Sequence, residues 1–219
     1  MAADAEVTRG PATEGGPASG IARTIGIALA AGLIAGGVTQ LLQGILPAGI
    51  SSFANSATPW LAVAFGAGST ASRWWLAAIA GAVTLLAALV GYYGLVQLRF
   101  GYGAELRGAV LLWLIAAVVG GPVFGVVGRW WRGDGRWLRA TGPALLGASA
   151  IAEGIYLAGI PTVASAGPLF VAVGLAIPVV LGRRRDDRIR GLLLLLPCVG
   201  LGAAGFLATL ALYGLLTGT

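Results

Sequence analysis

The chain has no histidine and no lysine, and it contains a single cysteine in 219 residues. A serine-histidine triad needs an imidazole, a Walker A loop needs a lysine, and Schiff-base chemistry needs an amine. Cys198 lies in an apolar run, and there is no second cysteine for a disulfide or a metal cluster. We therefore expect that the protein is not an enzyme and that it holds no cofactor and no metal ion.

Charge is also scarce, because only 10% of the residues are charged while 58% are hydrophobic, with a mean hydropathy of +0.89. Soluble domains carry about 25% charged residues. The 14 cationic residues are all arginines and lie between apolar segments instead of on one basic face. This pattern is typical of membrane topology signals and not of nucleic-acid binding. The composition predicts an integral membrane protein whose first partner is the lipid bilayer.

Hydropathy divides the chain into two regions. Residues 1–20 are polar and rich in small side chains, so we expect a disordered cytoplasmic tail. Residues 21–219 are predicted to form an all-α transmembrane domain, a bundle of about seven helices. The apolar segments are 24–46, 53–71, 74–98, 108–127, 140–158, 168–181 and 192–216. Segment 53–71 reaches a spanning length only by including Asn55 and Pro59.

The arginines predict the orientation of these segments. With seven spans and an internal N-terminus, twelve of the 14 arginines fall inside and only Arg99 and Arg107 fall outside. If segment 53–71 does not span, the best orientation leaves four outside. Because cationic side chains are retained on the cytoplasmic side, the first arrangement is favoured. It predicts a multi-pass protein with the N-terminus inside and the C-terminus outside, which for a bacterial protein would mean the cytoplasmic (inner) membrane.

The second half of the chain resembles the first. QGILPAGI at 43–50 aligns without gaps with EGIYLAGI at 153–160, which pairs Gln43 with Glu153. Further on, SATP at 56–59 meets SAGP at 165–168, and Arg73 meets Arg183. The alignment predicts a parallel 3+1+3 repeat, in which two units of three helices flank a linker helix. The alternative is chance similarity, which segments rich in alanine, glycine and leucine produce easily.

Glu153 is a carboxylate inside a predicted span, where an ionisable group is a candidate functional residue. The candidate ligand-binding residues, all on the predicted outer side of the midplane, are Glu153, Gln43, Gln40, Tyr93, Tyr156 and Tyr213. Arg99 and Arg107 are the cations that the predicted topology leaves free to pair with Glu153. The alternative is that the amides and hydroxyls only bond one another between helices and that the tyrosines form an interfacial belt.

Three residues in the middle of the fourth segment form a candidate helix break. Gly120, Gly121 and Pro122 combine flexible backbone with a proline that removes a helical hydrogen bond. Broken helices line the substrate sites of some transporters. The alternative is a kink that only serves packing against neighbouring helices.

Three motifs carry a family resemblance. YYG closes the third segment, GGPVFGVVGRWWR begins at Gly120 in the fourth, and AEGIY surrounds Glu153 in the fifth. In this combination the chain resembles an uncharacterised family of bacterial multi-pass membrane proteins, a domain of unknown function. The resemblance implies a membrane setting and identifies no substrate.

Two hypotheses of function follow. In the first, the protein binds or transports a small solute through an outward-facing polar cleft, where Glu153 favours a cationic or hydrogen-bond-donating ligand and Gln43 is its counterpart in the repeat. In the second, it is a non-transporting membrane subunit or scaffold that contacts lipids or partner proteins. Either form is compatible with a homo-oligomer or with a partner membrane subunit, and any use of ATP would require another chain, because the lysine of a Walker A loop is missing.

Overall fold

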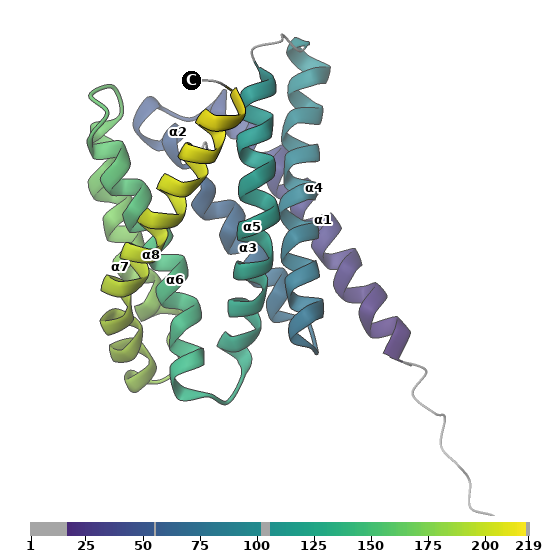
Figure 1. The fold of residues 1–219 in the computed structure, drawn as a ribbon, viewed down its shortest axis with the longest axis vertical. Coiled ribbons are helices and arrows are strands. Elements are labelled where there is room, and N and C mark those ends of the chain that lie inside the picture. Colours follow the sequence, from purple (N-terminus) through teal and green to yellow (C-terminus); the bar gives the residue numbers. More distant parts are fainter. Residues whose placement is uncertain (1–16, 55, 102–105, 218–219) are drawn as a thin grey trace, which may run out of the picture.

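The computed structural model describes residues 17–54, 56–101 and 106–217, and these residues fold into helices joined by short connections (Figure 1). The elements are α1 (Pro17–Gln43), α2 (Ala48–Ala54), α3 (Ala57–Ser69), α4 (Trp74–Phe100), α5 (Leu106–Arg132), α6 (Arg136–Ala158), the 3-10 helix η1 (Ala164–Ala166), α7 (Gly167–Leu181) and α8 (Arg185–Thr217). No strand occurs within the described ranges. The predicted all-α class is confirmed.

Five helical segments in the described part of the chain are long and apolar enough to cross a bilayer. They are Ala18–Gln43, Trp74–Phe100, Gly108–Arg132, Ala164–Leu181 and Arg185–Leu215. By contrast, α3 has only 13 residues, about 20 Å at 1.5 Å per residue. The 23 residues of α6 are long enough, but Arg136, Arg139 and Glu153 lower its apolar character. The long apolar helices indicate a membrane protein.

Several helix ends differ from the segment limits expected from hydropathy. α1 begins at Pro17, so the last residues of the expected tail are helical, while residues 1–16 lie outside the described part. α8 begins at Arg185, so most of the expected loop 183–190 is its first turn and a half. Asp186 and Asp187 lie in that first turn, where carboxylates stabilise a helix N-terminus. A charged helix end therefore extends beyond the apolar run.

The segment expected over 53–71 is divided into two helices. α3 starts after Ser56, an N-cap residue with extended backbone (φ −108°, ψ 145°) whose hydroxyl accepts a hydrogen bond from the Thr58 amide at 3.1 Å. Pro59 is tolerated because it falls in the first turn, where its missing N–H removes no helical bond. Asn55 lies outside the described residues. The polar interruption in the sequence is thus a helix start and not part of one continuous span.

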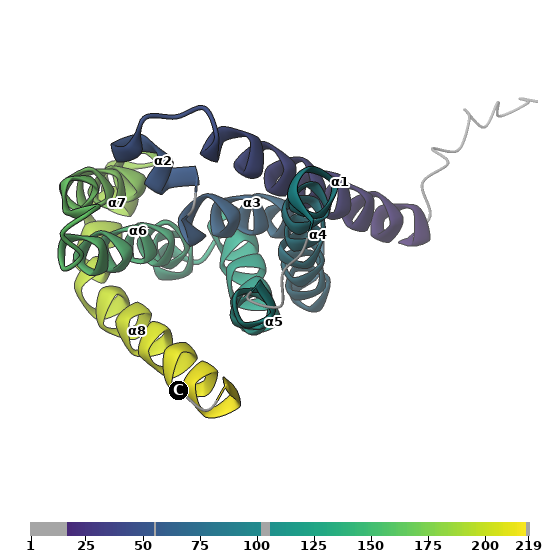
Figure 2. The ribbon, with the colours of Figure 1, turned by 90° about the horizontal axis from the view of Figure 1, so that it is seen from above.

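The helices form two groups that meet along α5 and α6 (Figures 1 and 2). In the first group, α1, α3, α4 and α5 pack together, and in the second α6 packs against both α7 and α8. The short helix α3 lies inside the first group and also contacts α6. Seen from above, α8 extends away from α7 at the edge of the molecule (Figure 2). The buried centre lies between α3, α4, α5 and α6, around Trp60, Phe65, Leu85, Phe124 and Leu146.

Glycines set the close approach of the helices in the half of the bundle that holds the α3–α4 and α5–α6 connections. A Cβ atom on Gly81 of α4 would meet the backbone of Gly121 in α5, and one on Gly125 of α5 would meet the backbone of Ala77. α5 continues as one helix through Gly120, Gly121 and Pro122. The expected helix break is therefore wrong, because these small residues bring two continuous helices into backbone contact, as the packing alternative proposed.

Candidate functional site

Most arginines of the described chain gather at one end of the bundle, here called the arginine end, which carries the α3–α4, α5–α6 and α7–α8 connections (Figure 1). Arg129 of α5 donates a hydrogen bond to the Ala71 carbonyl at 3.0 Å and so ties α5 to the α3–α4 connection. Arg99, at the end of α4, lies at the opposite end. The side chain of Arg107 is not among those described.

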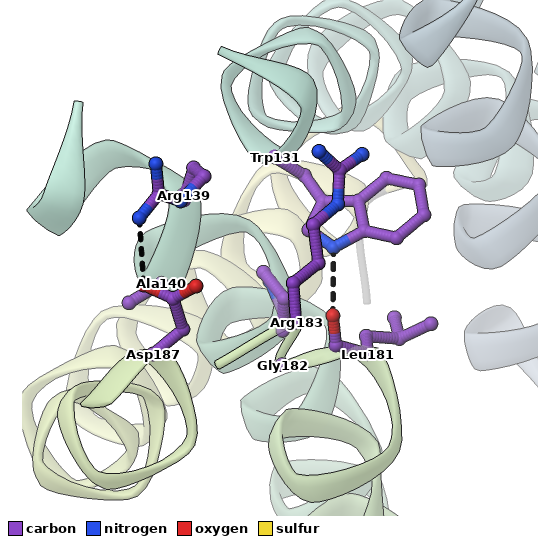
Figure 3. A pocket seen from close by; sticks show the side chains of 8 residues that line it. Trp131, Arg139, Ala140, Leu181, Gly182, Arg183 and Asp187 are labelled. Atoms are coloured by element: carbon purple, nitrogen blue, oxygen red, sulfur yellow. Dashed lines mark hydrogen bonds and ion pairs between the residues drawn. The ribbon is translucent and has the colours of Figure 1, made fainter. Parts of the chain in front are cut away.

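The α6 and α8 N-termini are joined at the arginine end by a buried ion pair (Figure 3). Arg139 Nη2 lies 3.1 Å from Asp187 Oδ1, and the two side chains are 12% and 4% exposed. Beside them, Trp131 Nε1 donates to the Leu181 carbonyl at 2.9 Å, and the Arg183 guanidinium lies 5.0 Å from the Trp131 ring centroid. These contacts fill the space between α5, α6 and α7 and close this part of the arginine end.

Removing Asp187 tests this closure. The variant Asp187→Ala leaves the buried Arg139 guanidinium without its carboxylate, and we expect a loss of about 3–5 kcal/mol in the free energy of unfolding. The matched control is Asp186→Ala, because Asp186 is 71% exposed and only contacts Arg190 at 3.5 Å. That variant should change stability by less than about 1 kcal/mol. Equal stability of the two variants in thermal unfolding would contradict the buried pair.

Glu153 is a residue of α6, and its carboxyl group lies against the N-terminus of α3. Its Oε2 accepts hydrogen bonds from the hydroxyls of Ser56 at 2.6 Å and Thr58 at 3.0 Å, and its Oε1 accepts one from the Ala57 amide at 3.3 Å. The positive end of the α3 dipole points at the same carboxylate. Glu153 therefore closes the α3 N-terminus from another helix and connects α6 to the first group of helices.

Of the two arginines expected to pair with Glu153, Arg99 contacts a different residue. Its Nη1 donates to Gln40 Oε1 at 3.3 Å, and its guanidinium lies 5.3 Å from the Phe100 ring centroid. The hydrogen-bond donors that contact Glu153 in the described residues are hydroxyls and amides of the chain around Ser56. In the described part of the chain, the Glu153 carboxyl group is therefore held by hydroxyl and amide dipoles and not by Arg99.

A cavity of about 270 Å³ lies beside this contact, in the half of the first helix group opposite the arginine end. Its wall is formed by Thr39, Gln43, Ala54, Ser56, Trp60, Tyr92, Tyr93, Val96, Ala109 and Trp113. Because a buried water needs only about 10–15 Å³, the cavity has room for a small organic molecule. Ser56 belongs to both places, since it lines the cavity and donates to Glu153.

Four aromatic rings dominate the cavity wall. Trp60 lies with its ring centroid 5.8 Å from that of Tyr92 and 5.8 Å from that of Trp113, at interplanar angles of 63° and 45°. Tyr92 and Tyr93 are 4.9 Å apart at 78°. The Trp60–Tyr92 and Tyr92–Tyr93 pairs are therefore in edge contact and the Trp60–Trp113 pair is tilted, so none of the three pairs is stacked. We call Trp60, Tyr92, Tyr93 and Trp113 the aromatic box.

The polar groups of the wall bond to one another. Trp60 Nε1 donates to Thr39 Oγ1 at 3.0 Å. Gln43 Nε2 donates to the Ala54 carbonyl at 3.1 Å, and its Oε1 accepts from the Tyr92 hydroxyl at 2.7 Å. This network fixes the Trp60 and Tyr92 rings, because each is held at its polar end by a neighbouring helix. The box is thus organised before any ligand enters.

The six candidate ligand-binding residues are divided between several places. Gln43 and Tyr93 line the cavity, whereas Glu153 lies behind Ser56 and Gln40 is buried against Arg99. Tyr156 is 48% exposed and Tyr213 lies against Gly108 of α5, so neither belongs to the wall. The sequence reasoning did not select Trp60, Trp113, Thr39, Ser56 or Tyr92 as ligand contacts. The polar residues before Trp60 mark the start of α3, and in the structure this helix start lies next to the cavity.

The helices and their composition define a class: an all-helical protein with several apolar helices of membrane-spanning length. Within that class the chain belongs to the family of unknown function DUF6518, whose model matches residues 16–213. This match confirms the resemblance to an uncharacterised domain family that the motifs indicated. No curated protein and no solved structure matches the chain.

Proposed function

We propose that the protein binds a small organic solute in the cavity lined by the aromatic box and exposes this cavity to the outer side of a bacterial cytoplasmic membrane. The observation that carries the proposal is the cavity itself, about 270 Å³ with aromatic and polar walls. Small-molecule sites are concave, mostly apolar, and lined with a few fixed polar groups. The buried network around Gln43 and Trp60 supplies such groups.

The proposed orientation has the N-terminus and the arginine end in the cytoplasm and the C-terminus outside. In favour of it, arginines are concentrated at the α3–α4, α5–α6 and α7–α8 connections. The cavity residues lie in the last turns of α1 and α4, at the end of α2 and the beginning of α3, and in the first turns of α5, away from that end. The α4–α5 glycine contacts and the Arg139–Asp187 pair lie in the half of the bundle toward the arginine end, away from the cavity. A cleft would therefore open outward.

We further propose seven membrane crossings in a parallel 3+1+3 repeat. α1 and α4 pack in parallel, since Gly32 and Gly36 of α1 meet Thr84 and Ala88 of α4 in the same order. The chain between them must return across the bundle, which α2 and α3 can do together. The second unit has a similar order, with a long helix α6, a short helix α7 and a long helix α8. This similarity of order supports the repeat, with α5 as the linker.

The second candidate function is a non-transporting membrane subunit. One observation favours it: α8 carries widely exposed leucines, including Leu193, Leu196 and Leu215, and is the least buried of the five apolar segments. A helix of this kind suits contact with lipid or with a partner subunit. The two candidates differ in one respect, because only the first requires a small molecule to bind in the cavity.

Ligand stabilisation tests the proposed function. The purified protein is heated in a maltoside detergent with a panel of neutral, cationic and zwitterionic solutes of low mass. A solute at 100 times its dissociation constant adds about 2.7 kcal/mol, which raises the melting temperature of a chain of this size by about 5–10 °C. We expect at least one solute to give a shift in this range.

A cavity-filling variant provides the specificity control. Ala109 lines the cavity on α5, so Ala109→Phe should abolish the ligand-dependent shift. The matched control is Val119→Phe on the same helix, because Val119 is 64% exposed and does not belong to the wall. It should retain the full shift. If no solute stabilises the wild-type protein, or if both variants respond alike, the solute proposal is wrong and the subunit alternative is the better one.

A further inference from the structure

We propose that the ligand of this cavity carries a methylated ammonium group, held by cation–π contact in the aromatic box. The inference rests on the proposed function, because it names the ligand class of the same cavity. It follows from three features of the wall: the arrangement of its rings, the state of its polar atoms, and the position of the nearest carboxylate.

The first feature is the arrangement of the rings. Aromatic faces attract a cation that lies within about 6 Å of the ring centroid, and tryptophan does so best. Trp60, Trp113 and Tyr92 line the same cavity. Trp60 contacts both other rings, with centroid separations of 5.8 Å and interplanar angles of 63° to Tyr92 and 45° to Trp113, so the three rings lie in different planes and none is stacked face to face on Trp60. A bulky, weakly hydrated cation matches such a box.

The second feature is that the acceptors in the wall already receive hydrogen bonds. Thr39 Oγ1 accepts from Trp60, Gln43 Oε1 accepts from Tyr92, and the Ala54 carbonyl accepts from Gln43. A primary ammonium group brings three N–H donors that need acceptors of their own. A quaternary ammonium group has no N–H, so it can enter this wall without breaking the network. Because a primary ammonium group would have to share acceptors that already receive a hydrogen bond, the wall favours the methylated form.

The third feature is a carboxylate behind the wall. Among the described residues that line the cavity none is charged, but Ser56 lines it and donates to Glu153 Oε2 at 2.6 Å. The carboxyl group is thus one side chain away from the ligand space. In its ionised form it would attract a cation and not a neutral molecule of the same shape, at no cost in direct hydrogen bonds. The low dielectric of the bundle strengthens such a long-range attraction.

The test compares two ligands of the same shape. Choline carries a trimethylammonium group, and 3,3-dimethyl-1-butanol replaces its nitrogen by carbon and is neutral. Isothermal titration is carried out in a maltoside detergent, which has no choline headgroup, with sodium chloride matched between the samples. We expect choline to bind about tenfold or more tightly than its neutral isostere, as a desolvated cation–π contact predicts.

Two substitutions at Trp113 connect this preference to the box. Trp113 is only partly buried, so its replacement is tolerated better than that of Trp60. Trp113→Leu should weaken the binding of choline more than that of the isostere and so remove most of the preference for choline, whereas Trp113→Phe should keep part of the preference. The control is Trp74→Leu, because Trp74 is 67% exposed at the other end of α4. It should bind both ligands as the wild type does.

The outcomes separate the two proposals. Equal affinity of wild-type protein for choline and its isostere, or no binding of choline, overturns the ammonium inference. If another solute of the panel still stabilises the protein and Ala109→Phe abolishes that effect, the cavity remains a solute site of different chemistry. If no solute binds at all, both proposals fall together. A preference for choline that survives Trp113→Leu also overturns the inference, since the box would not be its source.

Discussion

Replacing Gly81 by valine should prevent the bundle from assembling, whereas the same change at Gly94 should be tolerated. A Cβ atom on Gly81 would fall on the backbone carbonyl of Gly121, with Gly125 also within reach, so α4 and α5 must move apart. Backbone atoms cannot rotate away as a flexible side chain can. Overpacking in a tight interface typically costs about 1–3 kcal/mol and occasionally more. We expect a loss above about 3 kcal/mol.

Gly94 is the matched control because it lies in the same helix and has no atom within 4 Å of its added Cβ. Valine changes intrinsic helix propensity equally at both positions. The difference in unfolding free energy between the two variants therefore measures the effect of the contact between helices. The measurement is unfolding in mixed detergent micelles, with size-exclusion profiles to show whether the variants assemble. If both variants unfold at the same point, α4 and α5 do not approach as closely as described.

The glycine contacts also show what hydropathy can and cannot predict. The beginning of α4 at Trp74 and the end of α7 at Leu181 coincide with the limits of apolar runs, because the change from apolar to charged residues is local. The beginning of α8 does not, since arginines and aspartates also form helix outside lipid. Small residues at 120–125 were recognised as unusual, but sequence alone does not distinguish a kink from a backbone contact with Gly81.

The candidate site was predicted in part for a similar reason. Glu153 was identified because a carboxylate in an apolar segment needs compensation. Its partners Ser56 and Thr58 are 97 and 95 residues away in the chain, and no local pattern joins residues so far apart. Trp60 and Trp113 are ordinary apolar residues in sequence, and they become a wall only because α3 and α5 meet. Tertiary contact, and not composition, creates the cavity.

The role of Glu153 can be separated from that of a direct ligand contact. Three donors converge on its carboxylate, and none of its atoms belongs to the described cavity wall. Glu153→Ala should therefore lower the free energy of unfolding by about 3 kcal/mol, because the α3 N-terminus loses its acceptors inside the bundle. Glu153→Gln keeps one acceptor oxygen but turns an amide toward the remaining donors, so about half of that loss is expected.

Ser149→Ala is the matched control for these variants, because Ser149 lies one turn earlier in α6 and its hydroxyl donates to the Leu146 carbonyl of its own helix at 2.8 Å. Its stability should change by less than about 0.5 kcal/mol. In folded Glu153→Gln, a solute that stabilises the wild type should still bind, with weaker affinity if it is a cation. Because Glu153 does not line the cavity, a neutral solute should bind that variant with unchanged affinity. Complete loss of neutral-solute binding in folded protein would instead make Glu153 a direct ligand contact.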